Sequence, residues 1–305
     1  MKTNTADVII IGLGAMGSAS SYYLSKKGIR VLGIDTYKPP HNFGSSHGHT
    51  RVIREAYHEG TSYVPIVQRS YELWNEIQEF SSKNIIMEYG GIYIGSNGKY
   101  LSDAKLSAEK YKIPIEELKS DEIKDRYKVL NPPKHFTGLL ENRSGAVFVE
   151  NAIEYFLNKS KDFGSVHKFN EKVISWEKLS DSYKVITNKN TYFTEKIIFS
   201  SGAWIKDLIP TVNIPVKIER QVLFWLDPLK DKKLFSTENL INTGWDLDNG
   251  LEFYTQPIIE DKGFKVAMHH NGQFISPENL NRESNELDLT NIRNFLEEYI
   301  PDANG

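Results

Sequence analysis

Val8–Gly17, VIIIGLGAMG, is the stretch that decides the fold. Its apolar half predicts a buried strand, and its glycines predict a tight turn that opens directly into a helix. At such a junction Gly12 permits the turn, and Gly14 lets a pyrophosphate approach the backbone. Gly17 lets the helix pack closely on the strand. The helix N-terminus then points its N–H groups and positive dipole end at the phosphates, so the stretch predicts a dinucleotide site.

The residues that follow complete the same unit. A second apolar run, Arg30–Ile34, predicts the next strand and ends in Asp35, eighteen residues beyond Gly17. An acid at this position can hydrogen-bond the ribose hydroxyls of an adenosine. Strand, turn, helix, strand and acid in this order indicate a Rossmann-like βαβ unit, with a glycine turn that serves only packing as the alternative.

The composition bounds the class of protein. The chain has 305 residues, of which 39% are hydrophobic and 12% aromatic, enough for about two packed domains. Its net charge is −3 and it has no basic stripe, so we expect no nucleic-acid partner. It has no cysteine, which excludes disulfides, a thiolate nucleophile and cysteine-bound zinc and fits a reducing cytoplasm. No apolar run is long enough to span a membrane, so we expect a cytoplasmic protein without a membrane partner.

The periodicity of apolar residues alternates between helix and strand patterns. Helices are predicted at 63–79, 101–111, 120–127, 150–160 and 286–299. Strands are predicted at 85–94, 138–141, 146–149, 173–177, 183–187, 192–200, 216–226, 251–256 and 264–269. Gly90 and Gly91 interrupt the first of these strands and predict a bulge or tight bend there. The last three strands alternate apolar and polar residues, as one-sided antiparallel sheets do.

We therefore predict an α/β protein with two interleaved domains. A Rossmann-like nucleotide-binding domain is expected at residues 1–84 and 150–212. An antiparallel-sheet α+β substrate domain is expected at residues 85–149 and 213–285. Residues 286–305 are expected to begin a return to the nucleotide domain.

Five motifs occur in a fixed order along the chain. They are DTYKPPH at 35–41, GSSHGHTRVIR at 44–54, YVP at 63–65, SGAWIKDL at 201–208 and KVAMH at 265–269. Over essentially all of its length the chain resembles the monomeric sarcosine oxidase and N-methyltryptophan oxidase group of FAD-dependent amine oxidases. The resemblance implies that the nucleotide domain binds FAD and that the protein is a monomer.

The same resemblance implies the reaction. An N-methyl amino acid of the sarcosine or N-methyl-L-tryptophan type is oxidised to an imine, whose hydrolysis yields formaldehyde and the amino acid, while O₂ is reduced to hydrogen peroxide. The alternatives are another FAD-dependent amino-acid oxidase or dehydrogenase and an inactive fragment of such an enzyme. An NAD-dependent dehydrogenase would share residues 7–35 but would leave the arginine loop and the 265–269 strand unexplained.

The resemblance also assigns residues to the cofactor. Those expected to contact FAD are Gly12, Gly14, Ala15, Met16, Gly17, Asp35, Ser45, Thr50, Arg51, Val173 and Gly202. In this assignment Arg51 lies beside the flavin ring, and the backbone of Val173 holds the adenine edge. His47 and His49 lack a third ligand, so we expect no metal.

Four further residues match catalytic positions of the family, together with Arg51. Arg54 matches the arginine that binds the substrate carboxylate, with a surface ion pair to a neighbouring glutamate as the alternative. Lys265 matches the lysine that faces flavin N5, where oxygen is activated, with an exposed strand lysine as the alternative. His269 matches an active-site histidine, and strand alternation places it on the same face as Lys265. Tyr254 matches a tyrosine that contacts the substrate amine.

The family members continue past the position of Gly305. Their further segment carries the cysteine that attaches flavin covalently, a glycine-rich stretch beside the flavin and a lysine that helps bind the substrate carboxylate. We therefore expect that this chain is a truncated form that cannot make the covalent bond to flavin.

Overall fold

The computed structural model describes residues 4–96, 98–270 and 272–305 and divides the chain into two compact units. Unit 1 comprises Met1–Arg51, Ser81–Ile85 and Phe148–Val216. Unit 2 comprises Val52–Phe80, Ile86–Val147 and Lys217–Gly305. The chain thus passes repeatedly from one unit to the other, as the sequence analysis expected of two interleaved domains.

Unit 1 is built on a six-stranded sheet of order β10-β11-β12-β1-β2-β9. Its strands are β1 (Thr5–Ile11), β2 (Val31–Ile34), β9 (Val166–Lys168), β10 (Val173–Lys178), β11 (Tyr183–Thr187) and β12 (Thr191–Phe199). The four strands from β12 to β9 are parallel, and β11 and β10 continue the sheet in antiparallel pairing. Its helices are α1 (Ala15–Lys26), α5 (Val149–Asp162) and the short α6 (Ile205–Leu208).

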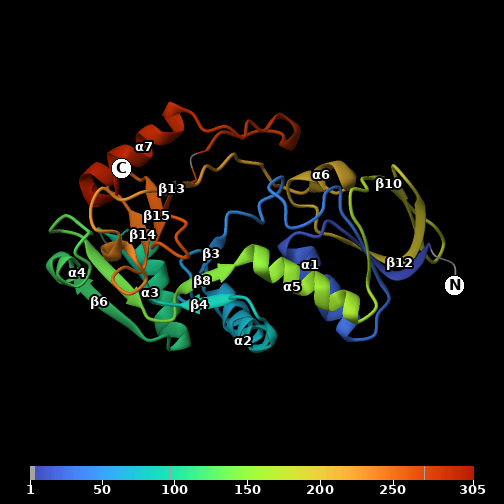
Figure 1. The fold of residues 1–305 in the computed structure, drawn as a ribbon, viewed down its shortest axis with the longest axis horizontal. Helices are drawn as coiled ribbons and strands as arrows, with labels where there is room; N and C mark the ends of the chain where they lie inside the picture. Colours follow the sequence, from blue (N-terminus) through green and yellow to red (C-terminus); the bar gives the residue numbers. More distant parts are fainter. Residues whose placement is uncertain (1–3, 97, 271) are drawn as a thin grey trace. The chain divides into compact units, whose positions relative to one another are not determined.

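Strand β1 is apolar on both sides because both faces of this sheet are covered. Ile9 and Ile11 belong to one buried cluster, whereas Val8 and Ile10 belong to a second cluster that includes Ile153 of α5. Helices α1 and α5 lie side by side in Figure 1 and in contact. This arrangement is the Rossmann-like βαβ unit that the glycine-rich stretch predicted.

His167 on β9 is partly buried in unit 1, and its surroundings lower its pKa. Its Nε2 lies 3.1 Å from the Ser21 hydroxyl and 3.2 Å from the Ser160 hydroxyl. Burial, with a smaller effect of the nearby Lys161 charge, lowers the pKa of His167 from 6.5 to about 4. Between about pH 6.5 and pH 4, the unfolded chain therefore binds a proton at His167 that the folded chain does not bind.

We expect the stability of unit 1 to fall with pH across that window. The contribution of a neutral, partly buried histidine is fully present above pH 6.5 and is lost as the pH approaches 4. The variant His167→Gln lacks the titrating ring. The amount by which the Tm of the wild type exceeds that of the variant should therefore shrink as the pH is lowered from 7 to 5. Thermal unfolding followed by circular dichroism measures this gap, and a gap that is constant with pH would contradict the assignment.

Unit 2 is built on a seven-stranded sheet of order β13-β16-β15-β14-β5-β7-β6. Its strands are β5 (Gly91–Gly95), β6 (Ile115–Lys119), β7 (Thr137–Glu141), β13 (Phe224–Leu226), β14 (Asn242–Asp246), β15 (Glu252–Gln256) and β16 (Phe264–His269). All neighbouring strands are antiparallel except the pair β14 and β5. Its helices are α2 (Val64–Phe80), α3 (Lys99–Tyr111), α4 (Ser120–Arg126) and α7 (Glu286–Tyr299).

Shorter elements complete the chain. A three-stranded sheet of order β3-β8-β4 comprises β3 (Thr50–Ile53), β8 (Gly145–Phe148) and β4 (Ile86–Glu88). The 3-10 turns are η1 (Thr61–Tyr63), η2 (Gly202–Trp204), η3 (Lys232–Phe235), η4 (Pro277–Asn279) and η5 (Pro301–Ala303). Gly90, with φ +97°, forms the bend between β4 and β5, which join different sheets.

The two faces of the seven-stranded sheet differ in chemistry. One face carries Phe253, Phe264 and Val266, which pack with Phe295 and Leu296 of α7 in the main core of unit 2. Helix α7 lies beside β13 and β15 in Figure 1. The opposite face carries the alternate side chains of the same strands, many of which are polar. This polar face holds the residues of the candidate substrate site.

The core also accounts for two differences from the predicted domain boundaries. The sequence analysis assigned residues 286–305 to the nucleotide domain, but α7 packs in unit 2 because its apolar stripe covers the sheet there. It assigned residues 52–80 to the same domain, but they also pack in unit 2. Tyr71 of α2 donates a hydrogen bond to Arg143 O at 2.7 Å, and Val64 packs against Ala108.

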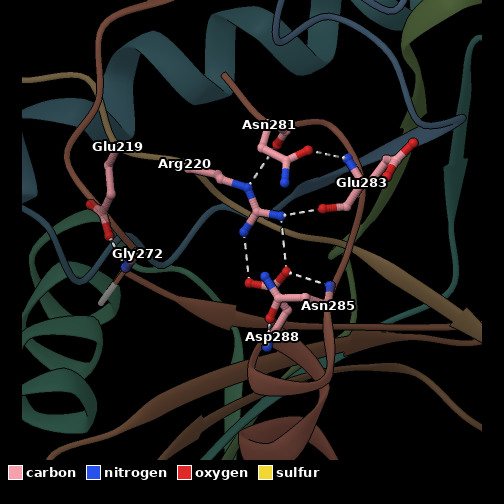
Figure 2. A network of polar contacts seen from close by, with 7 residues as sticks. All are labelled: Glu219, Arg220, Gly272, Asn281, Glu283, Asn285 and Asp288. Carbon is pink, nitrogen blue, oxygen red and sulfur yellow. Dashed lines mark hydrogen bonds and ion pairs between the residues drawn. The ribbon is translucent and has the colours of Figure 1, made fainter. Parts of the chain in front are cut away.

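A polar clasp fixes the start of α7 (Figure 2). Arg220 donates from Nη1 and Nη2 to the two carboxylate oxygens of Asp288, at 2.6 and 2.9 Å. It also donates to the carbonyl oxygens of Asn281 and Glu283, both at 2.9 Å. Asp288 in turn accepts from the backbone N–H of Asn285, the N-cap of the helix. One partly buried guanidinium thus joins the 281–285 segment to the first turn of α7.

The same clasp explains a strand that is shorter than predicted. The sequence pattern predicted a strand over 216–226, whereas only the β13 residues form one. Upstream, Arg220 N donates to Gln273 O at 2.9 Å, and the Glu219 carboxylate accepts from Gly272 N. Glu219 and Arg220 thus form their hydrogen bonds with the irregular residues Gly272 and Gln273, so no continuous strand ladder forms here.

We expect Arg220→Met to lower the free energy of unfolding by roughly 2–3 kcal/mol, because it leaves the partly buried Asp288 without its cation. The side chains of this pair are only 13% and 15% exposed. Urea unfolding measures the change, and Arg126→Met is the matched control. Arg126 pairs with Glu116 on the surface, where an ion pair contributes about 0–1 kcal/mol. Equal losses in the two variants would show that the clasp is no stronger than a surface pair.

Candidate functional site

The glycine turn of unit 1 has the geometry that a dinucleotide site needs. Gly12 has φ +93°, and a Cβ built there would lie 2.6 Å from Ser200 O. A Cβ at Gly17 would lie 1.8 Å from Gly12 O, so α1 starts in direct contact with the turn. A Cβ at Gly14 would approach only the Ser46 side chain, at 3.2 Å, among the described residues. Close packing therefore requires glycine at Gly12 and Gly17, whereas the space beside Gly14 is open.

Asp35 lies at the carboxyl end of β2, beside this turn. Its Oδ2 accepts a hydrogen bond from Leu13 N at 2.7 Å, and its Oδ1 accepts one from Tyr37 N at 2.9 Å. Asp35 O also accepts from Glu171 N at 3.0 Å, which brings the start of β10, with the buried Val173, toward the same strand end. The structure thus gathers Asp35 and Val173 near the glycine turn.

The loop before β3 forms a second wall of the unit 1 site. Ala15 N, the first amide of α1, donates to Ser46 Oγ at 3.1 Å. Arg51 folds back over the loop, donating to Thr50 O at 2.8 Å and to Ser45 O at 2.5 Å. Ser45, Thr50 and Arg51 were predicted from the sequence, but Ser46, whose side chain accepts the hydrogen bond from the helix N-terminus, was not. Its place in the same small-residue motif was the available signal.

The end of β12 supplies the third wall. Gly202, with φ +56°, is exposed at the start of η2. Ser201 Oγ next to it is buried and has no hydrogen-bond partner within the described part of the chain. Strands β1, β2 and β12 are parallel, so their carboxyl ends meet at one sheet edge, where dinucleotides bind in this architecture. An open Gly14, an exposed Met16 and an unsatisfied hydroxyl there fit a bound dinucleotide.

In unit 2 the polar face of the sheet gathers three predicted residues. Lys265 is 3% exposed, and its Nζ lies 5.2 Å from the centroid of the Trp225 ring on the neighbouring strand. It is therefore not an exposed strand lysine. His269 lies on the same face of the strand, four residues after Lys265. The centroid of its ring is 6.2 Å from that of the Tyr254 ring. The alternation read from the sequence is confirmed, since Phe264 and Val266 point into the core.

Arg54 lies in unit 2 as well, enclosed by aromatic rings. Its guanidinium carbon is 4.4 Å from the centroid of Tyr57 and 5.8 Å from that of Tyr93. Nη2 donates to Glu59 Oε1 at 2.5 Å, so the ion pair named as the alternative is present, although the Arg54 side chain is only 18% exposed. Burial pushes the pKa of Arg54 down, but Tyr93 and the Glu59 carboxylate outweigh it and raise that pKa overall. The residue is a permanent cation in a mostly enclosed place.

Two histidines near Arg54 are held neutral. Burial lowers the pKa of His58 to about 4, since the opposing pull of Glu59 is smaller and the Arg54 charge adds to the lowering. Burial also lowers the pKa of His269, and the neighbouring His270 and Arg54 add to the effect. At neutral pH these imidazoles can therefore accept a proton or a hydrogen bond.

The sequence analysis missed His58, Tyr93 and Tyr100, which surround Arg54. The His58 and Tyr100 rings lie with their centroids 3.7 Å apart and their planes tilted by 37°, and the Tyr93 ring meets each of them edge-on. His58 lies four residues after Arg54 in an irregular stretch, which gives no periodic signal. Tyr93 lies in the run GIYIG of β5, which reads as apolar throughout.

Comparison with known proteins places these features in a family. Residues 7–304 match the FAD dependent oxidoreductase family, DAO. The chain is 35% identical to monomeric sarcosine oxidase of Streptomyces avermitilis, over 99% of this chain and 79% of that protein. It is 31% identical to N-methyl-L-tryptophan oxidase of Yersinia pestis (strain Pestoides F), over 97% of this chain and 79% of that protein.

A solved structure agrees in fold. L-proline dehydrogenase from P. horikoshii superposes with a TM-score of 0.81 over 98% of this chain and 78% of that one, at 18% sequence identity. Across residues 4–96, 98–270 and 272–305 no helix is long and apolar enough to cross a membrane.

Proposed function

This chain belongs to the DAO family of FAD-dependent oxidoreductases, and from that premise we propose that it oxidatively demethylates an N-methyl amino acid. The cofactor is FAD. The products of the proposed reaction are formaldehyde, the demethylated amino acid and hydrogen peroxide. The proposal takes its substrate class from the named activities of the similar oxidases and from the chemistry of unit 2.

In this proposal unit 1 holds the FAD. The open backbone at Gly14 and the first turn of α1, with Ala15 and Met16, receive the pyrophosphate, and Asp35 receives the ribose. Ser45, Thr50, Arg51, Val173 and Gly202 complete the assigned contacts. Bound FAD supplies the two-electron oxidation of the amine and passes the electrons to O₂.

Unit 2 binds and prepares the amino acid. The observation that carries the proposal is Arg54, a cation that is mostly enclosed by aromatic rings and lies near the neutral His269. A guanidinium in such a place binds a carboxylate strongly, because little water competes. Its positive charge lowers the pKa of the substrate ammonium, and the neutral His269 imidazole can accept the proton that leaves. Lys265 and Tyr254 complete the polar face beside His269.

The test is a product analysis on the purified, FAD-loaded protein. Sarcosine and N-methyl-L-tryptophan are supplied separately, and formaldehyde, methylamine and hydrogen peroxide are quantified. The proposal expects formaldehyde and peroxide in a one-to-one ratio from at least one of the two substrates. Methylamine without formaldehyde would instead identify a deaminating amino-acid oxidase that attacks the Cα–N bond, and neither product from a protein that holds FAD would contradict the proposed oxidase activity.

A further inference from the structure

Three buried polar atoms in unit 2 lack a hydrogen-bond partner among residues 4–96, 98–270 and 272–305. They are Arg54 Nε, His58 Nδ1 and Tyr93 Oη, although His58 Nδ1 lies 3.4 Å from Glu59 Oε2 without forming a hydrogen bond to it. A buried polar group without a partner costs about 1–3 kcal/mol, and native proteins tolerate few of them. These three belong to neighbouring side chains, because the Tyr93 ring lies 5.8 Å from the Arg54 guanidinium carbon and 5.7 Å from the His58 ring. The three side chains with a polar atom that lacks a hydrogen bond therefore lie close together.

The backbone places Tyr93 in the row of residues that forms the candidate site. Tyr93 pairs with Gly244, Gly244 with Tyr254, and Tyr254 with Ala267, in a row across four strands. Paired residues project from the same face of a sheet, so Tyr93 lies on the polar face that carries Lys265. Gly244 has no side chain and Ala267 has only a methyl group, so Tyr93 and Tyr254 are the large side chains of this row.

The charges already present near Arg54 narrow the chemistry of the missing partner. Glu59 engages Nη2 of Arg54 and leaves Nε free of any hydrogen bond in the described chain. Both oxygens of the nearby Glu141 are occupied by the backbone N–H groups of Glu55 and Ala56, at 2.6 and 2.8 Å. Neither of these two carboxylates thus forms a hydrogen bond with Nε. A group that accepts from a guanidinium N–H and a phenol O–H together needs at least two acceptor lone pairs, and a carboxylate meets that need while forming a charge-assisted bond to the guanidinium.

Resting on the proposed function, we propose that Tyr93 is a second carboxylate-binding residue. Its hydroxyl and Arg54 Nε donate to the same substrate carboxylate, and His58 supplies a third polar contact from Nδ1. Tyr93 is 7% exposed, so its hydroxyl is shielded from bulk solvent and is available to a ligand that enters the site. The site accordingly selects amino acids over amines of the same size through Tyr93 as well as through Arg54.

The test uses a pair of ligands that cannot undergo the proposed demethylation. α-Aminoisobutyrate carries an amine and a carboxylate but neither an α-hydrogen nor an N-methyl group, and isopropylamine is the same molecule without the carboxylate. Isothermal titration calorimetry on the FAD-loaded protein should show that Tyr93→Phe weakens α-aminoisobutyrate binding about tenfold or more and leaves isopropylamine binding unchanged. His58→Phe, which keeps the ring contact with Tyr100, should show a smaller loss with the same selectivity.

A second measurement separates binding from structure. Because Tyr93 Oη has no partner in the ligand-free chain, Tyr93→Phe should leave Tm unchanged or raise it, whereas loss of a structural hydroxyl would lower it. Tyr127→Phe, the same change on a tyrosine that packs against the main core of unit 2, is the control for ligand binding.

The outcomes distinguish this inference from the function on which it rests. Wild-type affinity for α-aminoisobutyrate in Tyr93→Phe, together with its loss in Arg54→Ala, would overturn the role of Tyr93 and leave the carboxylate site standing. A wild-type protein that binds isopropylamine as tightly as α-aminoisobutyrate would overturn both. A lowered Tm in Tyr93→Phe with unchanged affinity would assign the hydroxyl to the fold.

Discussion

Gly14→Val is expected to leave unit 1 folded and to weaken FAD binding by at least about 100-fold, or roughly 2.7 kcal/mol. The substitution fits the protein, since a Cβ at Gly14 meets only the Ser46 side chain at 3.2 Å among the described residues. The rest of a valine side chain would then project into the space that the pyrophosphate needs. Titration with FAD, followed by quenching of flavin fluorescence, measures the affinity, and circular dichroism checks the fold.

Two matched variants sharpen this test. Gly17→Ala should damage the fold itself, because its Cβ would lie 1.8 Å from Gly12 O, which is backbone and cannot move aside cheaply. Ser20→Val introduces the same β-branched side chain later in α1 and should keep wild-type affinity for FAD. If Gly14→Val binds FAD normally, the cofactor does not approach this turn.

Arg54→Ala is expected to raise KM for sarcosine by about 10–150-fold while changing KM for dimethylamine little. The lost interaction is a charge-assisted hydrogen bond to the substrate carboxylate, which contributes about 1.5–3 kcal/mol, and dimethylamine has no carboxylate. Steady-state peroxide production with both amines measures the two effects. Equal losses for the two substrates would argue against a carboxylate clamp.

The ion pair with Glu59 requires a control of its own. Arg54→Ala also leaves Glu59 without its cation, although that carboxylate is 38% exposed and can be solvated. The double variant Arg54→Ala/Glu59→Gln removes both charges. If the clamp is the cause, the double variant should bind sarcosine as weakly as the single variant, because neither retains the guanidinium.

The unit 1 fold was predictable because its information is local. The βαβ unit, its glycine turn and its terminal acid occupy 30 or so consecutive residues, and each has a backbone or packing reason that a sequence displays. The face of β16 was predictable for the same reason, since Phe264 and Val266 alternate with Lys265 and Ala267. The FAD cofactor and the family were predicted from the resemblance that the five ordered motifs carry, and the comparisons confirm both.

The surroundings of Arg54 were not predictable because they are assembled from distant elements. His58, Tyr93 and Tyr100 meet only after β5 has paired with β14 and β7, and no local period records that pairing. The assignment of α7 failed for a related reason. An amphipathic stripe indicates that a helix covers a sheet but does not indicate which sheet. The contacts of Phe295 and Leu296 in the folded structure identify the sheet of unit 2.

The interleaving of the two units also sets the order of events during synthesis. Strand β1 lies between β2 and β12, and its residue Thr5 pairs with Phe193. At roughly 5–20 residues per second, β12 is made about 10–40 s after β1. During that interval the nascent chain carries β1 with one side unpaired, an apolar edge to which another chain can add. The period of greatest exposure to aggregation is therefore set by the distance in sequence between these two strands, and a substitution that stabilises the finished sheet leaves that period unchanged.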